Sequence, residues 1–260
     1  MTFPDGAAVA SPARATAPAR VRDRRHLGAA LALSGAVYLG FWFTYFGPHL
    51  RGTYPATPAA VHVHGWSFFA WYLLLPLQAT LVHARRVRLH RTLGWLSVAL
   101  ASLMVASGLA VVGVRMAEAT ASAEPSFWSM FGPMIAATLA LFAGFYVAAL
   151  VRRRVGASHK RLILVASAAG MGAAAFRIIG AIWGQVLWAV PAGILASNLF
   201  IVAGMAHDYA REKRVHPAYQ IGLLACLAVE VGVWPLTPTS AGRAIAQGLA
   251  WVGRTAGSLY

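Results

Sequence analysis

The chain has 260 residues, of which 59% are hydrophobic and only 11% are charged, and its mean hydropathy is +0.63. This composition excludes an ordinary soluble globular protein and indicates a membrane protein. The net charge of +15 comes from short segments beside apolar stretches, so the sequence predicts no nucleic-acid partner. A single cysteine, Cys226, excludes an intrachain disulfide and a cysteine metal cluster.

Seven apolar stretches approach or exceed the length of about 20 residues that a membrane-spanning helix needs. They lie near residues 27–47, 60–83, 92–114, 127–151, 161–184, 191–208 and 218–235. Their connections are short, so residues 26–236 form one domain. The sequence predicts an all-α fold, a polytopic bundle of seven transmembrane helices in contact with the lipid bilayer.

Two flanking segments differ from this domain. Residues 1–25 are rich in Ala, Arg and Pro, which predicts a disordered basic cytoplasmic tail. In the C-terminal segment 237–260, residues 239–254 are too short to span and carry Arg243, Gln247 and Arg254 near one face. That pattern predicts an amphipathic interfacial helix on the outer surface.

The basic residues predict the orientation. Seventeen of the 22 Lys and Arg lie in the N-terminal tail and the second, fourth and sixth connections. Arg51, Arg115, Arg243 and Arg254 fall on the opposite side, and Arg177 lies inside a stretch. Because positive segments stay in the cytoplasm, we expect a cytoplasmic N-terminus and an outside C-terminus. The Ala- and Arg-rich composition is typical of a high-GC bacterium, which places the chain in its cytoplasmic (inner) membrane. Anionic lipid headgroups are the expected partners of the positive side.

Four polar residues inside the predicted spans lie at a similar depth, where ionisable groups are costly and often functional. Arg177 lies about 16 residues into the fifth helix, roughly 24 Å from the inner surface, and Glu230 lies roughly 18 Å from it. His64 and Asn198 lie near the outer ends of the second and sixth helices. These counts place all four in one layer of the outer half.

This layer has two interpretations. Arg177 and Glu230 can form a buried ion pair that offsets the cost of two charges in the bilayer. Alternatively, Arg177 binds an anionic group such as a heme propionate, a quinone or a lipid headgroup, with His64 as axial ligand or proton donor. His62 and His64 are the candidate metal ligands. They lie about 200° apart on a regular helix, so they chelate only if the helix begins after His62.

A histidine precedes each helix that runs from inside to outside: His26, His90, His159 and His216. Two of these histidines begin similar sequences, His90-Arg-Thr-Leu93 and His159-Lys-Arg-Leu162. This similarity fits a repeated two-helix hairpin. One hypothesis is a cytoplasmic ring of imidazoles that binds a porphyrin or relays protons. The alternative is that these histidines lie at the interface because headgroups and helix ends accommodate them.

The sequence also carries the pattern HG…LHRxLG…HKRL…R, in His64-Gly65, Leu89-His90-Arg91-Thr92-Leu93-Gly94, His159-Lys160-Arg161-Leu162 and Arg177. The pattern resembles a family of uncharacterised bacterial multi-pass membrane proteins. More distantly, it is similar to cytochrome b561-like and ferric-reductase-like heme bundles, over about residues 60–180. The resemblance implies heme b ligation by His64, with Arg91, Arg161 or Arg177 near the propionates. Gln78 stands 14 residues beyond His64, where such two-heme cytochromes often have a second histidine, so one heme is implied at most.

Three functions are compatible with these features. The leading hypothesis is a heme- or quinone-associated redox or assembly module with its site in the outer half of the bundle. The cofactor-binding candidates are His64, Arg177, Asn198 and Glu230 in the outer layer, together with Gln78, His90 and His159. The alternatives are a non-catalytic scaffold or accessory subunit with a membrane-protein partner, and a small-solute or lipid transporter. A retinal pigment is excluded, because both lysines, Lys160 and Lys213, lie outside the predicted spans.

Overall fold

A computed structural model describes residues 25–122, 126–184 and 186–257. These ranges contain helices and no strand. The elements are α1 (Arg25–Phe41), η1 (Trp42–Phe46), α2 (Gly47–Leu50), α3 (Ala59–His83), α4 (Val87–Ala121), α5 (Phe127–Val151), α6 (Gly156–Gly170), α7 (Gly172–Trp183), α8 (Ala189–Ser197), α9 (Leu199–Glu212), α10 (Pro217–Leu236) and α11 (Ser240–Ala256). The predicted disordered tail lies almost wholly in residues 1–24, outside the described residues.

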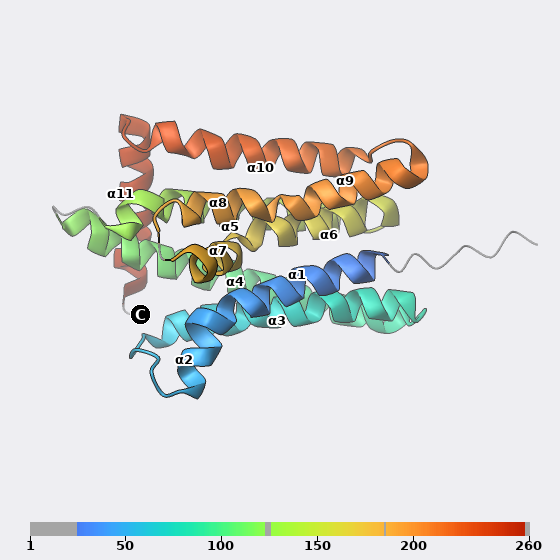
Figure 1. The fold of residues 1–260 in the computed structure, drawn as a ribbon, viewed down its shortest axis with the longest axis horizontal. Coiled ribbons are helices and arrows are strands. Elements are labelled where there is room, and N and C mark those ends of the chain that lie inside the picture. Colours follow the sequence, from blue (N-terminus) through green and yellow to red (C-terminus); the bar gives the residue numbers. More distant parts are fainter. Residues whose placement is uncertain (1–24, 123–125, 185, 258–260) are drawn as a thin grey trace, which may run out of the picture.

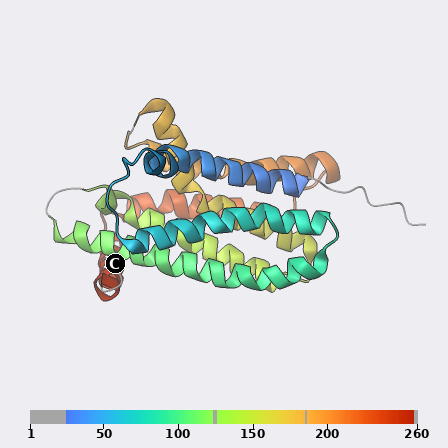
Figure 2. The ribbon, with the colours of Figure 1, turned by 90° about the horizontal axis from the view of Figure 1, so that it is seen from below.

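Six continuous helical segments within the described ranges are long and apolar enough to cross a membrane, and the bent pair α6–α7 makes a seventh if it counts as one span. The all-helical prediction is confirmed for these residues, and the fold is that of a multi-pass membrane protein. The spanning helices lie side by side along one long axis, with their connections gathered at two ends (Figures 1 and 2).

One end of the bundle gathers the basic connections. It holds the start of α1 and residues 84–86, 152–155 and 213–216, on the right in Figure 1, and we call it the basic end. The other end, the far end, holds residues 51–58, 184, 186–188 and 237–239. The basic connections, which alternate along the sequence, therefore lie together at one end of the folded bundle. Which end faces the cytoplasm stays a prediction.

The fifth predicted helix, 161–184, is present as two helices, α6 and α7, which form one span only if the bent pair is counted together. α6 and α7 are bent by 48° at a break between Gly170 and Gly172. The break falls within a run of small residues, 166–175, which lets neighbours approach closely on both sides. A Cβ at Gly172 would lie 2.9 Å from the Ile194 side chain on α8. The small residues predicted tight packing. The bend depends on the neighbouring helices, and the only feature of the sequence that indicates it is the pair Gly170 and Gly172.

The first span contains a turn of π-helix, η1, between α1 and α2. The backbone N–H of Gly47 donates to the carbonyl of Trp42, five residues back. A Cβ at Gly47 would lie only 2.8 Å from that oxygen, so the glycine makes the wide turn sterically possible. Single π turns inside helices often mark functional sites.

Side-chain caps and special backbone angles set several helix ends. Ser126 and Ser129 form a reciprocal capping box that starts α5. His216 caps α10 through Nδ1, which accepts from the Ala218 N–H at 3.1 Å, and Pro217 occupies the first turn. Lys213 ends α9 in the left-handed conformation.

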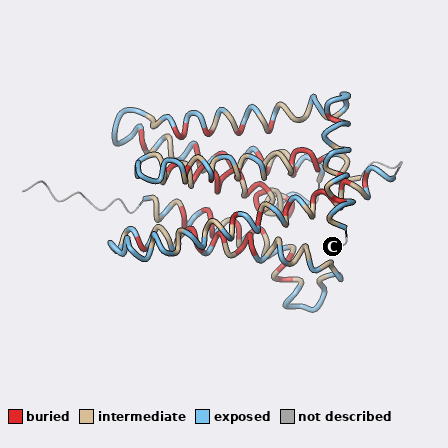
Figure 3. The backbone as a smooth tube through the Cα atoms, turned by 180° about the vertical axis from the view of Figure 1, so that it is seen from behind, coloured by how far each residue is buried: buried red, intermediate tan, exposed pale blue. Residues whose placement is uncertain are grey.

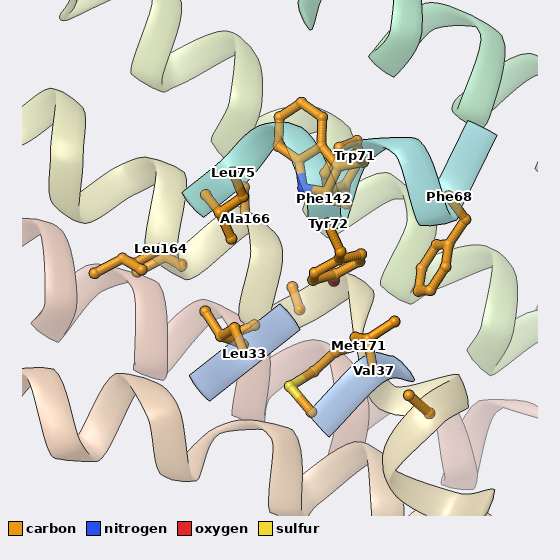
Figure 4. Close-up of a cluster of buried hydrophobic side chains, with 14 of the residues drawn as sticks. Leu33, Val37, Phe68, Trp71, Tyr72, Leu75, Phe142, Leu164, Ala166 and Met171 are labelled. Atoms are coloured by element: carbon orange, nitrogen blue, oxygen red, sulfur yellow. The ribbon is translucent and has the colours of Figure 1, made fainter. Parts of the chain in front are cut away.

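The main core lies where α1, α3, α5 and α6 meet (Figure 4). The buried hydroxyl of Tyr72 donates to the Ser167 carbonyl at 2.6 Å, and the indole N–H of Trp71 donates to the Ser167 hydroxyl at 3.2 Å. Buried residues follow the inward faces of the helices (Figure 3). Large apolar side chains such as Trp95 and Leu224 remain exposed on the outside, as lipid-facing residues should be.

The helix predicted at 239–254 is present as α11, which runs across the far end of the bundle in Figure 1. It packs on α4 where Gly113 and Gly253 bring the two backbones into contact. Arg243, Gln247 and Arg254 are all exposed. Its position at a membrane interface stays a prediction.

Candidate functional site

The four residues of the predicted outer layer occupy three separate places. Asn198 and Glu230 contact each other, whereas Arg177 and His64 each have partners elsewhere. Arg177 and His64 are connected indirectly through rings. The Arg177 guanidinium lies 4.4 Å from the centroid of the Phe41 ring, and Phe68 lies between the rings of Phe41 and His64.

The expected ion pair between Arg177 and Glu230 is absent from the described part of the chain. Nε of Arg177 donates to the Thr44 hydroxyl of η1 at 2.8 Å, and Nη1 donates to the Ala173 carbonyl at 2.6 Å. The guanidinium lies over the ring faces of Phe41 and Phe176. Backbone, hydroxyl and ring contacts therefore take the place of a carboxylate where α7 packs against η1.

Glu230 instead bonds to Asn198, at the junction of α8 and α9. Nδ2 of Asn198 donates to Oε2 of Glu230 at 2.6 Å. Both side chains are deeply buried, with 4% and 2% of their surface exposed. The remaining oxygens, Oδ1 of Asn198 and Oε1 of Glu230, have no hydrogen-bond partner in the described structure.

His64 packs against α4. Its Nδ1 lies 3.2 Å from the carbonyl of Met104 and 3.3 Å from the hydroxyl of Ser107, and a Cβ at Gly108 would lie 2.8 Å from the ring. α3 begins at Ala59, before His62, so the two histidines point to different neighbours rather than forming a chelate. Heme ligation by His64 stays a prediction, and no second imidazole contacts this ring within the described residues.

A cavity of about 580 Å³ lies at the far end, between η1, α2 and the start of α3. We call it the aromatic groove, and its lining is Tyr38, Trp42, Tyr45, Phe46, His49, Leu50, His62 and Trp66. Trp42, Leu50 and Trp66 form an exposed apolar rim. Its volume is within the range of about 300–1,000 Å³ that is usual for small-molecule sites.

An imidazole–phenol pair lies on the wall of the groove, beside a second imidazole, His49. The hydroxyl of Tyr45 lies 3.0 Å from Nδ1 of His62, so a hydrogen bond joins α3 to η1. The His49 ring stacks on Tyr54 with 4.1 Å between centroids, and 5.7 Å separates it from the His62 ring. Sequence reasoning considered His62 but missed Tyr45, although the aromatic run 41–46 was a visible signal.

Two guanidinium groups flank the groove. Arg177 donates a hydrogen bond to Thr44 of η1, the residue next to Tyr45. Arg51 folds back beside Gly47, where a Cβ would lie 3.1 Å from its Nη1. No acidic residue belongs to the lining. The site therefore has positive charge around an aromatic, weakly polar interior.

Three other predicted residues, Gln78, His90 and His159, lie toward the basic end. The centroids of the His90 and His159 rings are 6.5 Å apart, and the ring planes are nearly perpendicular at 81°. Nδ1 of His159 lies 2.8 Å from the Ala149 carbonyl, which fixes this nitrogen as the N–H and leaves Nε2 as the acceptor. Nδ1 of His90 and Oε1 of Gln78 are buried with no partner in the described structure. The repeated hairpins of the sequence thus bring their equivalent histidines together.

The strongest polar contact at the basic end joins Arg161, which the resemblance placed near a heme propionate, to Asp208, which was not predicted as a site residue. Arg161 donates from Nε and Nη2 to both carboxylate oxygens of Asp208, at 2.8 and 2.7 Å. Asp208 also accepts from the backbone N–H of His216 at 3.2 Å, so α6, α9 and the start of α10 are joined. Burial, followed by the positive charge of Arg161, lowers the pKa of His216, while Asp208 opposes the shift.

The fold and these sites define a multi-pass α-helical membrane protein with polar groups buried at several depths. Comparison with known protein families, curated proteins and solved structures finds no match to this chain.

Proposed function

We propose that the chain is an integral membrane protein that binds the headgroup of a quinone in the aromatic groove. The observation that carries the proposal is the hydrogen-bonded pair Tyr45–His62 on the wall of a 580 Å³ cavity. Apart from the His49 imidazole and the Tyr38 hydroxyl, which donates to the Phe69 carbonyl, the rest of the lining is apolar. Aromatic walls suit a planar ring. The pair also offers one donor to a carbonyl oxygen: Nε2–H of His62 when the Tyr45 hydroxyl donates to Nδ1, or the Tyr45 hydroxyl when Nδ1–H donates to it. The apolar rim gives access from the bilayer, where a quinone is dissolved.

The charges around the groove favour this ligand over a cation. Aromatic cages also bind quaternary ammonium groups, but Arg51 and Arg177 flank the groove and the lining has no carboxylate. Such a field disfavours a cationic headgroup and stabilises electron-rich oxygens. An interfacial aromatic belt accounts for Trp42 and Trp66 at the rim, but not for the hollow or for the Tyr45–His62 hydrogen bond.

Binding of a short-chain benzoquinone to the protein in lipid nanodiscs tests the proposal, because Trp42 and Trp66 report the ligand by fluorescence quenching. His62→Phe and Tyr45→Phe keep the aromatic walls and remove the Tyr45–His62 hydrogen bond. We expect each to weaken binding about 3- to 10-fold, the loss of one hydrogen bond worth about 1 kcal/mol. His64→Phe is the matched control, since His64 lies outside the groove, and should leave the affinity unchanged. Equal affinity in all three variants, or tighter binding of choline than of the quinone, rejects the proposal.

The His90–His159 pair supports a second candidate, a heme b or a single metal ion bound between the two imidazoles. Metal–nitrogen bonds of about 2 Å on each side are compatible with rings whose centroids lie 6.5 Å apart. The contact between His159 and the Ala149 carbonyl is the usual way in which a protein orients a ligating imidazole. A heme bound there supplies one-electron redox chemistry.

The visible spectrum and metal content of the purified protein test this second candidate. We expect a Soret band or a stoichiometric metal that is lost in His90→Ala and in His159→Ala. His83→Ala is the control, because His83 is also at the basic end but is outside the pair. Purified protein with neither heme nor metal, or retention of either in both variants, contradicts the candidate and leaves the quinone proposal untouched.

A further inference from the structure

We propose that Glu230 and Asn198 form a proton-binding site inside the membrane domain, in which Glu230 takes up and releases the proton and Asn198 positions its carboxyl group. The site is separate from the aromatic groove, and none of its residues belongs to the groove lining. It is a function in addition to quinone binding and does not rest on it.

The first observation is that two buried oxygen atoms of this site lack a hydrogen-bond donor. Asn198 Nδ2 satisfies Oε2 of Glu230 at 2.6 Å, but Oε1 of Glu230 and Oδ1 of Asn198 are buried and reach no donor in the described structure. An ionised carboxylate and an amide oxygen can only accept hydrogen bonds. Two buried acceptors without a donor are costly. One proton on Glu230 turns an acceptor into a donor and removes the carboxylate charge.

The second observation is the absence of a compensating cation in the described residues. Among the residues that the structure describes, no Arg, Lys or His nitrogen lies within 4.0 Å of the Glu230 carboxylate. Arg177, the arginine predicted for the same layer, donates to Thr44 instead. An uncompensated carboxylate is expensive in a membrane interior and binds a proton instead. Glu230 therefore differs from Asp208, whose charge is held by Arg161.

The helices packed against α10 carry few charges near this site. The titratable neighbour on α10 itself is Cys226, one turn away and fully buried. α5 and α8 have no charged residue. The charged residues of the other packed helices lie toward the two ends: His159, Lys160 and Arg161 on α6, His207, Asp208, Arg211 and Glu212 on α9, and Arg243 and Arg254 on α11. The proton equilibrium of Glu230 is thus controlled chiefly by Asn198 and by burial.

A proton fits this site better than a metal ion. Oxygen-binding cations such as Ca²⁺ and Mg²⁺ take about six or more ligands, whereas the unmatched oxygens here number two, from Glu230 and Asn198. No group of three or more metal-binding side chains occurs within the described ranges. A proton needs only one oxygen and one neighbouring acceptor.

Labelling with dicyclohexylcarbodiimide tests the proposal, because this apolar reagent reacts with protonated carboxyl groups inside membranes. Labelling of the full-length protein in nanodiscs is followed by peptide mass spectrometry over a range of pH. We expect modification at Glu230 whose rate falls about tenfold per pH unit above its midpoint, and none in Glu230→Gln. Glu212→Gln is the matched control and should label like the wild type, since Glu212 is exposed and beside Arg161.

Variants of Asn198 separate a positioning role from a packing role. Asn198→Ala removes the N–H that stabilises the ionised carboxylate, so the midpoint of the labelling curve should move to higher pH. Asn198→Gln keeps an amide and should move it less. A mere loss of packing changes the rate at all pH values without moving the midpoint.

Three results overturn the proposal. The first is a wild type that does not label at Glu230 at any pH, and the second is a labelling rate independent of pH. The third is protection of Glu230 by sodium at constant pH, which assigns the site to a metal cation instead. None of them bears on quinone binding, which is measured in the groove.

Discussion

Arg161 and Asp208 carry opposite charges where only 4% and 3% of their surfaces are exposed. Removing one partner of such a pair leaves the other charge buried and uncompensated, which costs about 3–5 kcal/mol. We therefore expect Arg161→Leu and Asp208→Leu each to lower the thermal stability of the protein in detergent strongly. The double variant should recover much of the loss, because no buried charge remains unpaired; Glu212, which also pairs with Arg161, is exposed.

The pair Arg115–Glu118 provides the control for this measurement. Its N–O distance is 3.0 Å, but both side chains are substantially exposed and lie three residues apart on one helix. Exposed pairs contribute about 0–1 kcal/mol, so Glu118→Gln should change the stability little. If Arg161→Leu were no more harmful than Glu118→Gln, the Arg161–Asp208 contact would have no structural role.

His216 predicts a pH dependence with a definite sign. Burial lowers its pKa below the ordinary value of 6.5, so the folded protein binds the proton less readily than the unfolded chain. The stabilisation is complete above pH 6.5 and is lost as the pH falls below it, with a slope of at most about 1.4 kcal/mol per pH unit. Protonation of Nδ1 also removes the acceptor that caps α10.

Comparison of the wild type with His216→Asn isolates this effect, because asparagine caps a helix without titrating. The stability difference between the two proteins should be constant from about pH 8 to pH 7 and change as the pH approaches 5. A difference that does not vary with pH would exclude His216 as the titrating group.

At the level of single residues, the sequence predicted which side chains are unusual but not their partners. His90 and His159 were singled out by their repeated motifs but not predicted to contact each other, and the centroids of their rings lie 6.5 Å apart. Arg177 and Glu230 were paired by depth alone, and they do not contact each other. Depth is one coordinate, whereas a contact also needs the rotation and tilt of each helix, and these depend on packing across the whole bundle.

At the level of elements, α1 and α7 contact through their backbones. A Cβ at Gly40 would overlap the carbonyl oxygen of Ala174, whereas a Cβ at Gly35, on the same helix, would meet nothing within 4 Å. This contact places Phe41 over the guanidinium of Arg177 and so supports the wall of the aromatic groove.

Gly40→Ala should therefore destabilise the protein by about 1–3 kcal/mol, the usual cost of overpacking. It should also weaken quinone binding, because η1 follows α1 directly. Gly35→Ala should be neutral or slightly stabilising, since alanine favours helix. Thermal unfolding in detergent measures the first effect and fluorescence quenching the second. Equal behaviour of the two variants would mean that α1 and α7 are not in backbone contact.

Hydropathy and helix-breaking residues predicted the ends of most helices to within a few residues, including those of α3 and α5. The departures lie where tertiary contacts change the local geometry. The bend between α6 and α7 and the π turn before Gly47 both arise at close approaches of backbone or side chain to a glycine. The aromatic groove follows from that second departure, which explains why it could not be located in advance.

For the molecule as a whole, the orientation in the membrane is the main prediction that remains to be measured. The basic end should face the cytoplasm, because positively charged connections are not readily translocated. In a Cys226→Ala background, Val155→Cys reports the basic end and Ala56→Cys the far end, and both native residues are exposed.

A membrane-impermeant maleimide applied to intact cells should label Ala56→Cys at once and Val155→Cys only after the membrane is opened. This result would place the aromatic groove and α11 at the outer surface, and the Arg161–Asp208 contact and the His90–His159 pair at the inner one. A quinone would then bind at the outer face, and the acidification that titrates His216 would act from the cytoplasm. The reverse labelling would exchange these sides without altering any contact within the bundle, so the local proposals can be judged separately from the topology.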